Sequence, residues 1–114
     1  MRLEDTQLLK GILEGCVLAI IRRGETYGYE ILSSLEKEGF DNLIEGTLYP
    51  VLTRMEKKGF ILCRIGKSPL GPKRKYYSIT MEGEQWLSDF TMQYRTVTRK
   101  ADNILLGESQ YENE

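Results

Sequence analysis

The sequence predicts a mainly α-helical protein that carries one small β-hairpin and continues into a long C-terminal helix. Apolar residues recur at steps of three and four in four segments, as amphipathic helices require. Between the third and fourth segments, two short runs of strand-forming residues flank a loop rich in glycine and proline. A chain of 114 residues has room for one hydrophobic core, so these elements must pack together.

The first two helices are short and separated by a tight connection. The first is expected over Asp5–Arg23, where one broad face is apolar, and Gly24 can adopt the left-handed conformation that ends a helix. The second is expected over Tyr27–Lys37, with Thr26 as its N-cap and Gly39 as its end. The wide apolar face of the first helix predicts burial against two partners.

The position of Pro50 fixes the start of the third helix. Proline is tolerated only in the first helical turn, so this helix is expected to begin between Glu45 and Thr47. It then runs to Lys58 and stops at Gly59. Its core stripe leaves one polar and basic face exposed.

The hairpin follows directly. Strands are expected over Phe60–Ile65 and Tyr76–Ile79, and the connecting loop over Gly66–Lys73. A two-stranded hairpin is marginal in isolation, so it must pack on the helices. Because successive strand side chains alternate between faces, one of Tyr76 and Tyr77 is expected in the core and the other in solvent.

The last helix is expected to begin after Thr80, which can cap it. Its apolar residues follow alternating steps of three and four, which is the a/d pattern of a helix that packs against another helix. The expected organisation is therefore a helical and hairpin domain over residues 1–80, a C-terminal helix over residues 81–106, and a disordered acidic tail over residues 107–114.

Composition excludes several classes of function. The chain has no histidine and two cysteines far apart in sequence, so neither a histidine-dependent catalytic site nor a zinc site is expected, and we predict neither metal nor cofactor. An enzyme is not expected. No apolar run reaches the roughly 20 residues that span a bilayer, and the acidic start is unlike a signal peptide, so we expect a cytoplasmic protein without membrane contact.

Charge is segregated although the formal net charge is only −1. The segment 54–75 holds eight basic residues against one acidic residue, whereas the remainder holds eight basic and sixteen acidic residues. Such a basic block is the electrostatic footprint of a nucleic-acid-binding surface. The alternative is an ordinary solvated face.

The order of the elements favours DNA binding. Three helices followed by a basic hairpin form the plan of a winged helix-turn-helix, in which the third helix enters the major groove and the hairpin contacts neighbouring phosphates. Tyr49 has an equally good structural role under the hairpin, and alternation leaves open whether Arg74 or Lys75 faces DNA. The candidate DNA-binding residues are Thr47, Tyr49, Arg54, Lys57, Lys67, Lys73, Arg74 and Lys75.

The apolar seam of the last helix predicts a homodimer. A seam on one helix needs a partner, and the first helix already covers the small core, so a second subunit is the expected partner. The alternative is packing of this helix on the first helix of the same chain. The expected dimer-interface residues are Leu8, Leu87, Phe90, Tyr94, Val97, Ala101 and Ile104.

Specific motifs resemble the PadR family of bacterial transcriptional regulators. The resemblance is carried by Gly28-Tyr29-Glu30, by the segment GTLYPVL at 46–52, by Leu62, by GPKRKYYSIT at 71–80, and by Gly83. It covers almost the whole chain and points to the compact members, which have a single C-terminal helix. It implies a dimeric repressor that binds a pseudo-palindromic, double-stranded DNA operator.

The same resemblance implies an effector site. In compact drug-sensing members an aromatic residue of the last helix stacks on flat ligands at the centre of the dimer. The matching position here is Tyr94, with Val97 one turn further along, so a small hydrophobic or aromatic effector is a candidate ligand. The alternative function for the whole chain is a winged-helix interaction module whose basic face docks an acidic protein partner.

Overall fold

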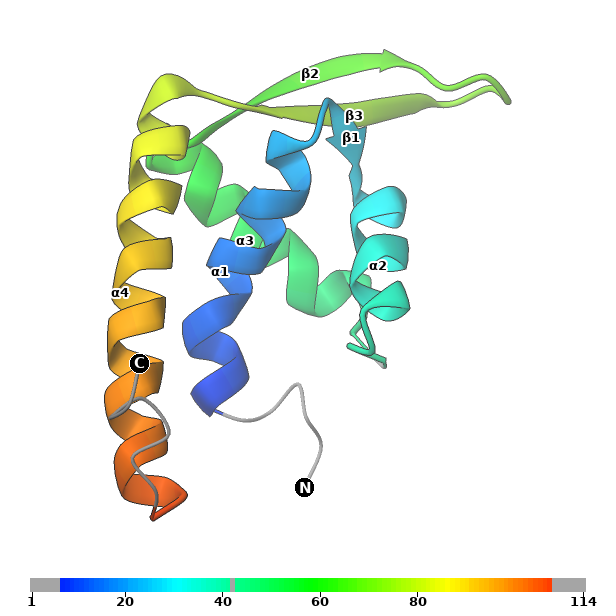
Figure 1. Ribbon diagram of the computed structural model, residues 1–114. Coiled ribbons are helices and arrows are strands. Elements are labelled where there is room, and N and C mark those ends of the chain that lie inside the picture. Colours follow the sequence, from blue (N-terminus) through cyan, green and yellow to red (C-terminus); the bar gives the residue numbers. More distant parts are fainter. Residues whose placement is uncertain (1–6, 42, 108–114) are drawn as a thin grey trace.

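The computed structural model describes residues 7–41 and 43–107 and contains four helices and a three-stranded antiparallel sheet. Figure 1 shows the sheet lying across one end of α1, α2 and α3, with α4 running alongside α1. The elements are α1 (Gln7–Arg22), β1 (Thr26–Tyr27), α2 (Gly28–Lys37), α3 (Glu45–Lys57), β2 (Ile61–Lys67), β3 (Lys73–Ile79) and α4 (Met81–Leu105). None of the described helices is long and apolar enough to span a membrane.

The four expected helices are all present. Gly24, Gly39 and Gly59 follow the first three helices with positive φ angles of 155°, 96° and 81°, as expected of residues that end helices. Helix α4 begins at its expected cap, because the Thr80 hydroxyl accepts a hydrogen bond from the Gly83 amide at 3.0 Å. The Thr80 hydroxyl also donates to the Gly59 carbonyl oxygen, which ties the start of α4 to the end of α3.

The expected role of Thr26 as an N-cap is wrong. Tyr27 occupies the N-cap position of α2, and no side chain caps that helix end. Thr26 instead pairs with Tyr77 in the short strand β1, and its hydroxyl donates to the Glu30 carboxylate. Strand pairing fixes the Thr26 backbone in the extended conformation and buries its side chain, so the residue becomes part of the sheet.

The hairpin therefore belongs to a three-stranded sheet of order β1-β3-β2. Strands β2 and β3 pair in register from Ile61 opposite Ile79 to Lys67 opposite Lys73, so both extend further towards the loop than expected. The loop is reduced to residues 68–72. The long ribbon projects beyond the helices (Figure 1).

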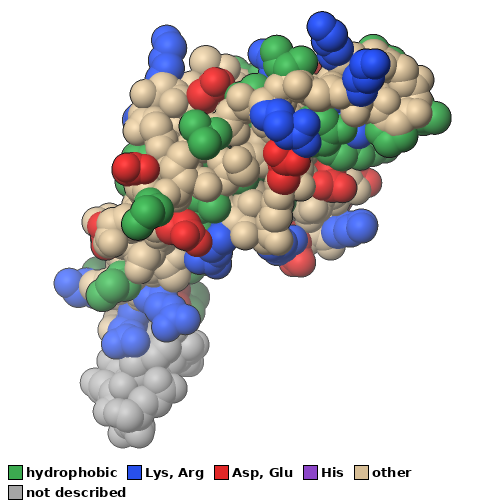
Figure 2. Space-filling model, turned by 90° about the horizontal axis from the view of Figure 1, so that it is seen from above, with side chains coloured by type: hydrophobic (Ala, Val, Ile, Leu, Met, Phe, Trp, Pro, Cys, Tyr) green, Lys and Arg blue, Asp and Glu red, His purple; other side chains and the backbone are tan. Residues whose placement is uncertain are grey.

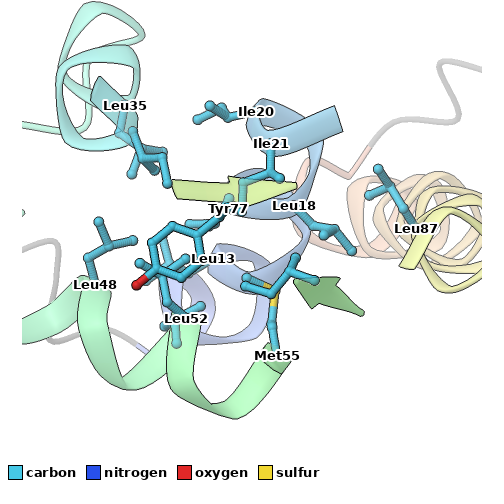
Figure 3. Close-up of a cluster of buried hydrophobic side chains, with 14 residues drawn as sticks. Leu13, Leu18, Ile20, Ile21, Leu35, Leu48, Leu52, Met55, Tyr77 and Leu87 are labelled. Atoms are coloured by element: carbon cyan, nitrogen blue, oxygen red, sulfur yellow. The ribbon is translucent and has the colours of Figure 1, made fainter. Parts of the chain in front are cut away.

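The hydrophobic core lies between the three short helices and the sheet (Figure 3). Val17, Leu18, Ile31 and Met55 are completely buried, and Tyr77 reaches into the same cluster from β3. Tyr77 is thus the core tyrosine of the pair, whereas Tyr76 lies half-buried on the opposite face. Burial raises the pKa of Tyr77 to about 12, so its hydroxyl stays protonated at neutral pH.

Helix α4 divides into a packed first half and an exposed second half. Leu87 is only 2% exposed and belongs to the chain's own core, so this member of the expected dimer interface is already covered by its own subunit. Phe90 lies half-buried against Gly15 of α1, where even a methyl group in place of the glycine hydrogen would collide with the ring. Further along, Val97 and Ile104 are 62% and 81% exposed.

Candidate nucleic-acid interface

One face of α3 is exposed and carries polar groups. The opposite face is buried through Leu48, Val51, Leu52 and Met55, which fixes the rotation of the helix on the core. Pro50 lies in the second turn of α3 as observed, since the helix begins at Glu45, the first residue of the expected interval. The exposed face is formed by Tyr49, Pro50, Thr53 and Lys57.

Two predicted contact residues of α3 are engaged elsewhere. Thr47 is half-buried and borders an apolar hollow with Leu13, Leu43 and neighbouring leucines. The Arg54 guanidinium pairs with the Glu14 carboxylate of α1. Both side chains therefore point towards α1 and α2, and Tyr49 and Lys57 remain as the predicted residues on the exposed face.

The hairpin forms a basic ribbon, which we call the wing (residues 61–79). Lys67 and Lys73 face each other in the last pair of the ladder and are both exposed, as is Lys75. Gly71 closes the turn with a φ angle of +135°, a conformation that disfavours residues with a side chain. Figure 2 shows lysine and arginine side chains along the projecting end of the wing.

A groove of about 530 Å³ separates the wing from α2 and the start of α3. The wing contributes three cationic residues to it, Lys73, Arg74 and Lys75, and the helical side contributes one carboxylate, Glu45. Tyr29 and Tyr49 complete the helical side, and Tyr29 is 71% exposed. The excess of positive charge makes the groove suitable for a polyanion.

Tyr49 satisfies both roles that its position suggested. Its hydroxyl oxygen lies where a Cβ atom on Gly28 would come within 2.8 Å, so the glycine leaves the space in which the tyrosine hydroxyl sits. The same side chain remains 41% exposed and lines the groove. Gly28 in α2 therefore positions a side chain of α3.

Register separates Arg74 from Lys75. Lys75 pairs with Ile65 and shares a sheet face with Tyr77, whereas Arg74 pairs with Gly66 on the outer face. Arg74 is half-buried because its guanidinium carbon lies 3.8 Å from the centroid of the Tyr27 ring. Both residues nevertheless border the groove.

Sequence reasoning missed three residues of this surface: Tyr27, Tyr29 and Arg64. Tyr27 was expected to point into the core as an apolar helical position, but it belongs to β1 and stacks with Arg74. Arg64 lay within the basic block, yet its pairing with Glu25, which comes from the turn after α1, has no local signal. The flanking of Gly28 by two tyrosines was the available sequence signal for an exposed aromatic surface.

A second, apolar pocket of about 270 Å³ lies between α1 and α4. It is lined by Cys16 and Ala19 of α1, by Phe90 and Tyr94 of α4, and by Phe40 from the connection before α3. Tyr94 thus borders a pocket, while Val97 does not. Burial raises the pKa of the Cys16 thiol, so it remains protonated and unreactive. Within residues 7–41 and 43–107, no cluster of side chains is suited to hold a metal ion.

Comparison with known proteins identifies the family. The model of the transcriptional regulator PadR-like family matches residues 17–89. The crystal structure of a PadR-like transcriptional regulator from Bacillus cereus is 47% identical, with a TM-score of 0.79 over 90% of this chain and 100% of that chain. That of a Streptococcus transcriptional regulator is 46% identical, with a TM-score of 0.78 over 88% and 98%.

A curated relative carries the same family name. The negative transcriptional regulator PadR of Bacillus subtilis is 28% identical over 88 residues, which cover 75% of this chain and 48% of that protein. This chain thus spans about half the length of that relative. The family and its structural neighbours are transcriptional regulators and not enzymes. The chain belongs to the PadR-like family of transcriptional regulators.

Proposed function

We propose that this regulator is a repressor that binds a pseudo-palindromic DNA operator as a homodimer. The observation that carries the proposal is the groove in which three cations of the wing face the exposed start of α3. A helix of this diameter fits the major groove, and the lysines of a wing at its side are then placed at the flanking phosphates. The name of the Bacillus subtilis relative, a negative regulator, supports repression over activation.

The contact residues follow from this geometry. Tyr49 and Lys57 lie on the exposed face of α3, and Lys67, Lys73 and Lys75 extend the positive surface along the wing. Thr47 and Arg54, which were also predicted to bind DNA, make their contacts within the protein in the free chain, so we assign them supporting roles.

The homodimer is proposed on the exposed half of α4. Tyr94, Val97 and Ile104 are 46%, 62% and 81% exposed and continue the a/d seam of Leu87 and Phe90. Helix α4 extends past the first turn of α1 (Figure 1), so α1 does not cover this half of the seam. Ala101 lies half-buried in the same row, and Leu8 of α1 is 77% exposed. A two-fold dimer through this seam supplies the missing partner.

A small, flat, apolar effector is proposed for the pocket between α1 and α4, with Tyr94 as a stacking residue and Val97 at the nearby dimer seam. The pocket continues a row of stacked rings, in which Trp86 lies 5.2 Å from Phe90 and Phe90 lies 6.5 Å from Tyr94. Trp86 is the sole tryptophan, so its fluorescence should change when a planar aromatic dye binds. An unchanged emission spectrum of Trp86 at saturating dye, or an equal change in a Tyr94→Ala variant, would contradict this site.

DNA binding is tested by fluorescence anisotropy. The protein is titrated against a duplex from the region upstream of its own gene and against a scrambled duplex, at two salt concentrations. We expect binding to the upstream duplex to be about 10³-fold tighter, with an affinity that falls as salt rises. Equal, weak binding to both duplexes, combined with capture of an acidic protein, would instead support the interaction-module alternative.

A further inference from the structure

Two arginines flank one tyrosine ring on the outer face of the wing. In the register of the sheet, Arg64 lies opposite Tyr76 and Arg74 lies opposite Gly66, so the side chains of all four positions share this face. Tyr27 of β1 pairs with Tyr76 from the other side and joins them. The two guanidinium carbons lie 4.6 Å (Arg64) and 6.0 Å (Arg74) from the Tyr76 ring centroid.

The charge of Arg64 is already compensated. Its Nε and Nη2 atoms donate hydrogen bonds of 2.9 and 2.6 Å to the two carboxylate oxygens of Glu25. This two-pronged pairing lowers the pKa of Glu25 and raises the pKa of Arg64, so both groups stay ionised over the working pH range. Arg64 therefore has fewer free donors and no net charge to offer a polyanion.

Arg74 differs in its partners. Within the described residues it forms no ion pair, and its guanidinium lies flat enough on Tyr27 for the guanidinium carbon to reach 3.8 Å from the ring centroid. Stacking occupies one face of the guanidinium and leaves the N–H donors at its edge available. Arg74 also borders the groove together with Lys73 and Lys75.

The ring of Tyr27 is itself held in place. It meets the Tyr76 ring edge to face, with centroids 5.9 Å apart and an interplanar angle of 76°. Its backbone is fixed by pairing with β3 at Tyr76. Gly66 leaves the space on this face, because a Cβ there would come within 2.6 Å of the Arg64 side chain and 3.2 Å of the Tyr76 ring.

We propose that Tyr27 is a positioning residue that holds the Arg74 guanidinium at the mouth of the groove, where its free edge binds a DNA phosphate. Arg74 is thereby the arginine of the wing that contacts DNA, whereas Arg64, neutralised by Glu25, supports the stack. A guanidinium that is already ordered loses less conformational entropy on binding than a free arginine. This inference rests on the proposed DNA binding.

The test is a double-mutant cycle between Tyr27 and Arg74, measured as duplex affinity over a salt series. Arg74→Ala should weaken binding about tenfold and reduce the slope of log K against log salt by about 0.9, the value for one phosphate contact. Tyr27→Leu should cause a comparable loss in the wild type and no further loss in the Arg74→Ala background. Tyr27→Phe, which retains the ring, should restore the affinity lost in Tyr27→Leu.

Two further variants keep the test sharp. Arg74→Lys retains the charge but loses the planar, stacking group, so it should preserve the salt slope and still lose affinity. Lys37→Ala removes an exposed charge at the end of α2 away from the sheet (Figure 1) and serves as the matched control. Thermal unfolding of each variant verifies that the fold is intact.

The inference is overturned if Tyr27→Leu lowers affinity by the same factor with and without Arg74, because that result describes a general structural role. It is also overturned if Arg74→Ala leaves the salt slope unchanged. Failure of the proposed function looks different, since the wild-type protein would then not distinguish the upstream duplex from the scrambled one in the first place.

Discussion

Replacing Arg74 and Lys75 together by alanine is expected to weaken operator binding by about 2 kcal/mol or more, which corresponds to roughly a 30-fold rise in Kd. Both residues border the groove, from opposite faces of β3, so the double variant removes positive charge from both faces of the wing. The affinity for a scrambled duplex should fall by a similar factor, because phosphate contacts carry no sequence information.

The measurement is an anisotropy titration over a salt series, in parallel with sedimentation. The dimer should persist, since neither residue lies on α4. Lys37→Ala provides the charge-matched comparison outside the groove. An unchanged affinity in the double variant would remove the wing from the mechanism.

Val97→Asp is expected to abolish the dimer. Val97 is 62% exposed in the single chain and lies in the apolar row that continues from Leu87 and Phe90. In a two-fold dimer each substitution occurs twice in one interface, so two carboxylates would lose water without gaining a partner. The cost of several kcal/mol should raise the dimer dissociation constant by more than a hundredfold and weaken operator binding with it.

Asn103→Asp is the matched control for this substitution. Asn103 is exposed on α4 and lies about 120° around the helix from Val97, so the same charge is added away from the seam. Sedimentation at several concentrations distinguishes monomer from dimer. A dimer of normal stability in Val97→Asp would show that this half of α4 does not form the subunit interface.

Local sequence signals were sufficient for the helices and the wing. Pro50 and the glycines that end helices have meanings that depend on a few neighbouring residues, and the structure has them in the expected places. The core tyrosine could be narrowed to Tyr76 or Tyr77 by alternation alone. The choice between them required knowing which face of β3 the helices cover, and that is settled by packing.

Features that depend on residues distant in sequence were not predictable. Strand β1 consists of two residues that gain an extended conformation only by pairing with β3, about 50 positions later. The pairing of Arg54 with Glu14 and of Arg64 with Glu25 likewise joins segments about 40 positions apart. These contacts decide which arginines remain available, so the basic block alone overstated the positive charge that the surface can offer.

Leu87 illustrates the same limit for the C-terminal helix. The a/d pattern identifies apolar positions that need a partner, but it does not distinguish a partner in the same chain from one in another. The structure assigns Leu87 to the core of its own subunit and leaves Tyr94, Val97 and Ile104 exposed. Both alternatives for this helix therefore apply, each to one half of it.

Hydroxyl-radical footprinting of the wild-type protein on its tightest-binding duplex tests the central claim most directly. A homodimer that inserts one α3 helix per subunit should protect two half-sites whose centres lie one helical turn, about 34–36 Å, or a multiple of it apart, with flanking protection at the backbone under each wing. The Arg74→Ala, Lys75→Ala variant should lose the flanking protection first. A single protected patch, or uniform weak protection along the duplex, would contradict the account.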